Sequence, residues 1–424
     1  MRKILDKFLL QSKNSNKIES SFKYLEKNTE VAKIFQAIET YSKNSELRYV
    51  GGCVRKILCK EKIDDIDLAT NLEPSDVSAA LKSKNIKFYE TGIKHGTITA
   101  VINKKKFEIT SLRKDVSTDG RHAEVKYSKD WQEDASRRDF TINSIYSNMF
   151  GDLYDPFNGK KDLSNGIIRF IGEPEKRIKE DYLRILRYVR FFLCYSKIKH
   201  NDNVISIIKK NIDGVYKIST ERQLDEFKKL TKTEGFLNLP KDKALCEIIQ
   251  LIFPQFKKIN ILKNQRNFIE NNLEKVDFII WISLLTIDGT DNVEYFLYKF
   301  NLSNKDKKRI LFLNNFFSKK ISNKDFSLQN LQKIFYFEGK QTLNDVLFFQ
   351  AMRSKKIDKK ILNFIDFFKN KEPPLLPLRA ITLMTKYNIP EGKELGIKLK
   401  KIEEKWVDNN FKISEQEVQD LISS

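Results

Sequence analysis

Two aspartates, Asp65 and Asp67, are the first residues in this sequence whose type and spacing could do chemistry. Side chains alternate along a β-strand, so on a strand both carboxylates face the same way and Ile66 faces the core. Two like charges at this spacing repel unless a divalent cation lies between them, and Mg²⁺ is commonly held by one or two carboxylates together with substrate phosphates. A solvated edge strand or turn is the alternative, and it is favoured for an isolated pair of this kind.

A double glycine upstream of the aspartates changes that balance. Gly51 and Gly52 stand between a short apolar run and apolar residues at helical spacing. Glycines at such a turn let a phosphate approach the backbone near exposed helix N–H groups, and Arg55, one turn later, could pair with a phosphate oxygen. A phosphate turn beside a carboxylate pair indicates two-metal transfer chemistry, in which the metals activate an attacking hydroxyl and stabilise a leaving pyrophosphate.

Further along, one aspartate and three arginines recur at every third position: Asp181, Arg184, Arg187 and Arg190. On a helix, consecutive members of this row are neighbours. A surface helix with an ion pair is the ordinary explanation, but three adjacent arginines repel one another unless an anion lies beside them. Cytosine and adenine present an amino donor beside a ring-nitrogen acceptor, which a carboxylate with a guanidinium complements. Uracil and guanine present the reverse pattern and leave both charged groups unsatisfied.

A third segment, residues 137–143 (RRDFTIN), offers paired guanidinium groups for phosphate and an aspartate that can orient Arg138. Together with GGCVR, DIDLAT and EDYLR, it resembles the class II tRNA nucleotidyltransferases, the CCA-adding enzymes, whose close relatives are bacterial poly(A) polymerases. The resemblance covers residues 45–235 and returns near the end of the chain. One departure is Lys56, which stands where the family usually has an acidic residue.

The resemblance implies an α+β fold. A nucleotidyltransferase head of the polymerase β type, with a small mixed sheet, is expected over residues 46–170 after a helical segment at 1–45. An all-helical neck with the base-reading motif is expected at 171–235, and a helical body and tail that bind tRNA at 236–424. The charged stretch 114–125 is expected to help switch specificity from C to A. Residues 218–230 resemble a further family motif that opens a helix.

The implied activity is template-independent addition of CCA to the 3′ end of tRNA, from CTP and ATP with release of pyrophosphate. Asp65 and Asp67 are the expected catalytic and Mg²⁺-binding residues. The expected nucleotide-binding residues are Gly52, Arg55, Arg138, Asp181, Arg184, Arg187 and Arg190. Glu108 is either a third carboxylate near the metals or an exposed strand residue. The alternatives are a poly(A) polymerase, an enzyme that adds only CC or only A, and an inactive RNA-binding relative.

Composition agrees with a polyanionic partner. The chain has 424 residues and 78 Lys and Arg against 57 Asp and Glu, a formal charge of +21 that favours nucleic acid or an anionic membrane surface, although codon bias toward lysine is an alternative. Lysine-rich runs after the head (307–309, 319–320, 355–356, 359–360 and 400–401) fit contacts with RNA phosphates.

Other features of the sequence exclude further classes of protein. The longest apolar stretch, residues 278–287, is too short to cross a bilayer and predicts a buried helix. Four cysteines without CxxC spacing argue against disulfides and a cysteine zinc site. These features predict a cytoplasmic protein that does not bind membranes, and they leave its oligomeric state open.

Overall fold

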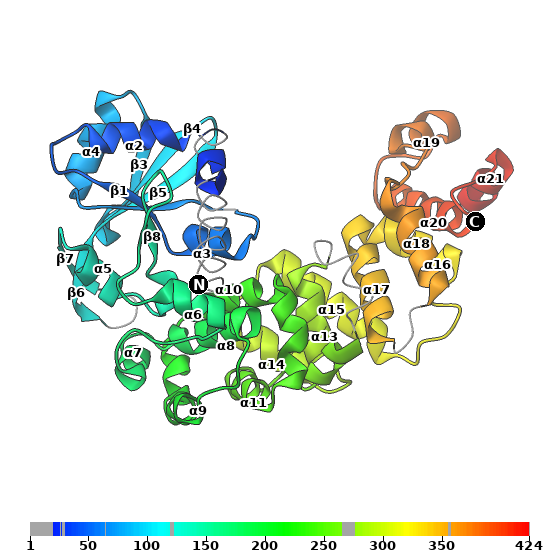
Figure 1. Cartoon of the computed structure of the whole chain (residues 1–424). Helices are drawn as coiled ribbons and strands as arrows, with labels where there is room; N and C mark the ends of the chain where they lie inside the picture. The colour runs from blue at the N-terminus through cyan, green and yellow to red at the C-terminus, as the bar shows by residue number, and fades with distance from the viewer. Residues whose placement is uncertain are drawn as a thin grey trace, which may run out of the picture. The chain divides into compact units, whose positions relative to one another are not determined.

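The computed structural model describes residues 20–25, 27, 30–63, 65–118, 123–264, 276–354 and 358–423. For residues 115–118, 123–125 and 264 it describes the backbone alone. The chain divides into two compact units, Met1–Leu230 and Thr231–Ser424. The first holds a mixed sheet and helices and the second holds helices (Figure 1). This confirms the predicted α+β class. The finer domain boundaries expected from the sequence stay predictions.

The first unit is built on a seven-stranded sheet in the order β3-β4-β5-β2-β1-β8-β9. Strands β2 and β5 pair in parallel and the other neighbours pair antiparallel. A separate hairpin pairs β6 with β7. The strands are β1 (Leu47–Val50), β2 (Asp67–Thr70), β3 (Lys87–Gly92), β4 (Thr97–Ile102), β5 (Lys105–Ser111), β6 (Arg113–Thr118), β7 (Ala123–Tyr127), β8 (Tyr146–Ser147) and β9 (Leu153–Tyr154).

Helices surround this sheet and continue beyond it. They are α2 (Val31–Glu39), α3 (Gly52–Cys59), α4 (Pro74–Ser83), α5 (Trp131–Ser136), α6 (Gly159–Asn165), α7 (Pro174–Glu180), α8 (Leu183–Tyr195), α9 (Asp202–Lys210) and α10 (Thr220–Thr231), with short 3₁₀ turns η1 (Ile93–His95), η2 (Thr141–Asn143) and η3 (Ile212–Lys217). Helices α2 and α4 lie together against the sheet (Figure 1). The core between them contains fully buried side chains such as Phe35, Leu81 and Phe107. This core holds the ends of β1 and β2 in fixed positions.

An aromatic cluster fastens α8 to the RRDFTIN segment. The Phe140 ring lies 4.7 Å from the Phe170 ring and 5.5 Å from that of Phe191, between centroids. Tyr188 stacks on Phe170 at 5.8 Å. Because these rings are almost fully buried, the arginines on α8 are held rigidly beside the RRDFTIN segment.

The regular elements described in the second unit are all helices. Its elements are η4 (Glu234–Lys241), α11 (Lys243–Ile252), η5 (Ile259–Asn264), α13 (Phe278–Thr286), α14 (Asn292–Lys299), α15 (Asn304–Ser318), α16 (Leu328–Phe337), α17 (Gly339–Arg353), α18 (Lys359–Lys369), α19 (Ala380–Tyr387), α20 (Lys393–Asp408) and α21 (Glu415–Ser423). Helix α13 is buried along most of its length, as its apolar sequence predicts. In the described part of the chain, no helix is long and apolar enough to cross a membrane.

One of the basic runs assigned to RNA does not behave as expected. Arg309 is 8% exposed, and its Nε and Nη2 donate to the buried Asp345 carboxylate at 2.7 and 2.8 Å. Arg309 therefore holds α15 to α17, because a buried guanidinium needs a paired carboxylate. The prediction of a phosphate contact is wrong for this residue. Residues 355–356 lie outside the described residues.

Candidate active site

A cavity of about 590 Å³ in the first unit brings the predicted site residues together. It is lined by Gly51, Gly52, Arg55, Asp67, Arg113, Arg137, Arg138, Asp139, Asn143, Asp181, Leu183, Arg184, Arg187, Arg190, Phe191, Arg222 and Lys229. All seven predicted nucleotide-binding residues and Asp67 are among them. Eight arginines and one lysine face three aspartates in this lining. The cavity is therefore strongly cationic and suited to a polyphosphate.

The glycine turn lies between the acidic and basic walls of the cavity. Gly51 follows β1 with φ +65°, a conformation that side chains disfavour. A Cβ on Gly51 would lie 3.4 Å from Arg138 Nη1, and one on Gly52 would lie 3.8 Å from Asp67 Oδ2. Because no side chain fills this gap, the backbone at the start of α3 stays close to both charged groups.

The two predicted catalytic aspartates occupy different positions. Asp67 is the first residue of β2 and lines the cavity, whereas Asp65 is exposed, precedes the strand and is absent from the lining. The expected strand over both residues is wrong, because β1 turns into α3 at Gly51 and ceases to pair with β2. The role of Asp65 stays a prediction.

The environment of Asp67 suits a cation. Burial raises the pKa of Asp67, the Glu108 carboxylate raises it further, and Arg138 opposes them. Glu108 is the exposed residue opposite Asp67 in the parallel ladder. A divalent cation would offset this repulsion. Among the described residues, no group of three His, Cys, Asp or Glu side chains is arranged to hold a metal.

Arg55 and Arg138 are held by their neighbours before any ligand binds. Arg55 donates through Nη1 to Asn143 Oδ1, and its guanidinium lies 4.7 Å above the Phe191 ring. Arg138 donates through Nη2 to Asp134 Oδ2 at 3.1 Å and through Nε to the Tyr146 hydroxyl at 3.0 Å. Such prior fixation lowers the entropy lost when an anion binds.

Arg187, which is partly exposed, makes an ion pair with the buried Asp139 carboxylate. Its Nε and Nη2 both lie 2.6 Å from Asp139 Oδ2. Burial alone would raise the pKa of Asp139, but Arg187 and the hydrogen bonds from Asn143 and the Phe140 amide outweigh it and lower that pKa to about 2. The pair joins α8 to the RRDFTIN segment by charge as well as by packing.

This pair predicts acid sensitivity. A carboxyl whose pKa is lower in the folded than in the unfolded chain stabilises the fold above its unfolded pKa and loses that contribution as pH falls through its folded pKa. We expect Asp139 to contribute on the order of 2 kcal/mol at neutral pH. In denaturant titrations, the difference in unfolding free energy between the native chain and Asp139→Asn should narrow from about pH 5 to about pH 2. A difference that does not change with pH would contradict this assignment.

Asp181 and Arg184, which the sequence predicts to contact the base, do not lie on one continuous helix. Asp181 lies in the break between α7 and α8, with φ −151°, and its Oδ1 accepts from the Leu183 N–H at 3.1 Å. Arg184 lies on α8 and donates to Glu180 Oε2 at 2.8 Å. The expected continuous helix fails because Asp181 has an extended backbone and uses its side chain to cap the following turn. Both side chains still line the same cavity.

Other lining residues were not among the predicted ones. Arg222 of α10 lines the cavity and donates to Asp181 Oδ2 at 2.9 Å. Glu226 of the same helix lies outside the lining and accepts from Arg190, a predicted residue, at 2.5 Å. Arg222 and Glu226 stand one helical turn apart in residues 218–230, which resemble a further family motif. That spacing was the sequence pattern that could have indicated their role. The predicted specificity segment 114–125 includes residues 119–122, which lie outside the described residues.

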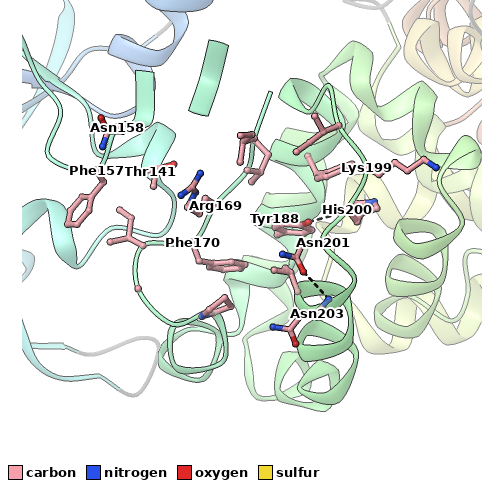
Figure 2. A pocket seen from close by; sticks show the side chains of 18 of the residues that line it. Thr141, Phe157, Asn158, Arg169, Phe170, Tyr188, Lys199, His200, Asn201 and Asn203 are labelled. Atoms are coloured by element: carbon pink, nitrogen blue, oxygen red, sulfur yellow. Dashed lines mark hydrogen bonds between the residues drawn. The ribbon is translucent and has the colours of Figure 1, made fainter. Parts of the chain in front are cut away.

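A second, larger cavity of about 750 Å³ lies against another face of α8 (Figure 2). Its walls carry Phe170, Tyr188, His200 and amide side chains, and the Tyr188 hydroxyl lies 3.2 Å from His200 Nδ1. Arg169, at its edge, is paired with Asp162. None of the predicted site residues lines this cavity. The cavity is larger than the cationic one, but the charged side chains are gathered in the smaller cavity.

Comparison with known proteins agrees with this arrangement. Residues 47–169 match the poly(A) polymerase head domain. The chain is 44% identical over 196 residues to the mitochondrial CCA tRNA nucleotidyltransferase 1 of Danio rerio, covering 45% of this chain and 46% of that protein. It is 30% identical over 274 residues to the CCA-adding enzyme of Staphylococcus epidermidis, covering 63% and 64%. The matches span about half to two thirds of these relatives.

Solved structures share the fold over most of the chain. The CCA-adding enzyme of Bacillus stearothermophilus in complex with CTP matches with a TM-score of 0.69 and 24% identity, over 89% of this chain and 92% of that one. The Thermotoga maritima CCA-adding enzyme complexed with tRNA matches with a TM-score of 0.59 and 18% identity, over 93% and 96%. Residues 47–169 are therefore similar to the poly(A) polymerase head domain, and the curated proteins that the chain resembles include CCA-adding enzymes.

Proposed function

We propose that this protein adds C, C and A in turn to the 3′ end of tRNA, using CTP and ATP and releasing pyrophosphate. The observation that carries the proposal is the cationic cavity, where a glycine turn, Asp67 and the pair Asp181 and Arg184 meet. A nucleoside triphosphate needs all three features: an open backbone, a carboxylate for its metal and a polar edge for its base. The names of the curated relatives support the same activity.

The residues divide the work according to their chemistry. Arg187 and Arg190 grip the triphosphate, while Arg55 and Arg138 fix the phosphates beside the glycine turn. Asp181 accepts a hydrogen bond from the amino group of cytosine or adenine, and Arg184 donates to the ring nitrogen. The 3′ oxygen of the tRNA bonds to the α-phosphorus as the bond to the pyrophosphate breaks, and the hydroxyl proton passes to solvent.

The poly(A) polymerase head-domain family uses divalent metals, and we propose Mg²⁺ for this chain, held by Asp67 with Asp65 as the second carboxylate. The like charges around Asp67 fit such an ion. When bound, it would neutralise charge on the triphosphate and lower the pKa of the attacking hydroxyl. The phosphates of the nucleotide would supply further ligands, because Mg²⁺ is commonly held by one or two carboxylates together with substrate phosphates.

The tRNA is the proposed partner of the basic residues beyond the cavity. Contacts with phosphates position an RNA without reading its sequence, and recognition by shape suits an acceptor stem. We also propose a cytoplasmic location, and the described cysteines form no disulfide.

The test uses the full chain and a tRNA that ends before CCA. With CTP, ATP and Mg²⁺, we expect a product extended by CCA and then no further growth. A tail of adenosines without cytidine would instead indicate a poly(A) polymerase. Extension that stops after CC, or that requires a tRNA already ending in CC, would restrict the activity to CC or A addition. No extension at all would leave the non-catalytic RNA-binding alternative.

A further inference from the structure

The Asp181 carboxylate is held from two sides. Its Oδ1 accepts from the Leu183 N–H at 3.1 Å, and its Oδ2 accepts from Arg222 Nη2 at 2.9 Å. The Asp181 and Arg222 side chains are 25% and 31% exposed, so both remain open to the cavity that they line. A carboxylate has about four acceptor positions. Two are used within the chain, and the rest are free for a ligand.

The frame that carries Arg222 is rigid. The buried Gln223 side chain donates to the carbonyls of Val215 and Ile218 at 3.0 and 2.9 Å, which ties the start of α10 to η3. The Tyr182 ring packs on the same turn so closely that a Cβ on Gly214 would lie 2.0 Å from it. Asp181 precedes Tyr182 and Arg222 precedes Gln223. Both partners of the ion pair are therefore anchored to η3.

The same helix also holds the far end of the arginine row. Glu226, one turn after Arg222 on α10, is 2% exposed and accepts from Arg190 Nε at 2.5 Å. Helix α10 thus contacts Asp181 with a cation and Arg190 with an anion. This pattern fixes the orientation of the base-reading carboxylate relative to the arginines assigned to the triphosphate.

We propose that Arg222 is a positioning residue for base selection. It holds the Asp181 carboxylate so that a free lone pair points at the amino group of cytosine or adenine. A base with a carbonyl at that place meets an ionised acceptor and is rejected. The inference rests on the proposed function, because it assigns a role to Arg222 in selecting the nucleotide. A different role, direct contact with the triphosphate, would affect all four nucleotides equally.

The experiment compares Arg222→Gln and Arg222→Lys in the full chain, with Lys228→Gln as the matched control. Lys228 is an exposed cation on the same helix. Kinetic constants for CTP and UTP are measured on a tRNA that ends before CCA, and thermal unfolding checks that each variant folds. We expect Arg222→Gln to lower the ratio of kcat/KM for CTP over that for UTP by about 10- to 100-fold, the effect of losing one charged hydrogen bond.

Arg222→Lys keeps the charge without the planar fork, so it should recover part of the ratio. The control should leave the ratio unchanged. Equal losses with CTP and UTP, or an unchanged ratio in Arg222→Gln, would overturn the positioning role. If Arg222→Gln does not fold, the ratio in Arg222→Lys decides the matter, because an unchanged ratio there overturns the proposal. Failure of the proposed function is distinct, since the native chain would then add no cytidine at all.

Discussion

Asp67→Asn is expected to lose nucleotide transfer almost completely while still binding tRNA. The amide keeps the shape of the side chain but removes the charge that a divalent cation needs. Loss of the metal removes several kcal/mol of transition-state stabilisation, which corresponds to a fall in kcat of about a thousandfold or more. Binding of tRNA should change by less than about twofold, because the phosphate contacts of a folded RNA are spread over many residues.

The measurement is single-turnover addition of the first nucleotide, beside a filter-binding assay with the same tRNA. Glu90→Gln is the matched control, since Glu90 is an exposed carboxylate on β3 outside the cavity. Asp65→Ala should also abolish transfer if both aspartates hold metal, as the sequence predicts. Activity that survives Asp67→Asn would show that the metal lies elsewhere.

The second large effect is expected at Asp181, in the choice of nucleotide. Asp181→Asn keeps an acceptor for the Leu183 N–H but replaces an ionised acceptor with an amide that can also donate. The ratio of kcat/KM for CTP over UTP should fall by about a hundredfold or more, because an amide can donate to the carbonyl of uracil as well as accept from the amino group of cytosine. The fall should come from slower use of CTP and faster use of UTP.

Asp213→Asn provides the comparison, since Asp213 is an exposed carboxylate on η3. Thermal unfolding of both variants shows whether the loss of selectivity is accompanied by destabilisation at the start of α8, where Asp181 accepts from the Leu183 N–H. Uniform loss of activity with all four nucleotides would show that Asp181 has only a structural role.

Much of the site was visible in the sequence because its residues lie in short contiguous segments. The turn at Gly51 and Gly52, the strand that begins at Asp67 and the arginines of α8 each carry a local pattern, since helix and strand periodicities place side chains directly. The head fold followed from the same segments. Phe140, whose ring packs the RRDFTIN segment against Phe191 of α8, lies in one of these contiguous segments as well.

The remaining features depend on contacts between distant parts of the chain. Arg222 contacts Asp181 from helix α10, and the residues around Asp181 in the sequence do not indicate this contact. Arg309 stands in a basic run but is buried against Asp345, because burial depends on how α15 packs rather than on local charge. The helix breaks at Asp181 because its side chain accepts from the Leu183 N–H. The recurrence of charged residues at every third position does not reveal this break.

The central claim is that the cationic cavity binds the nucleotide through the edge of its base. The most direct measurement is a crystal structure of the full chain with CTP. The account predicts the cytosine amino group within hydrogen-bond distance of the Asp181 carboxylate, its ring nitrogen facing Arg184, and the phosphates among Arg187, Arg190 and the glycine turn. A base bound in the larger cavity beside Tyr188 and His200 (Figure 2), or triphosphate binding with no contact to Asp181 and Arg184, would contradict it.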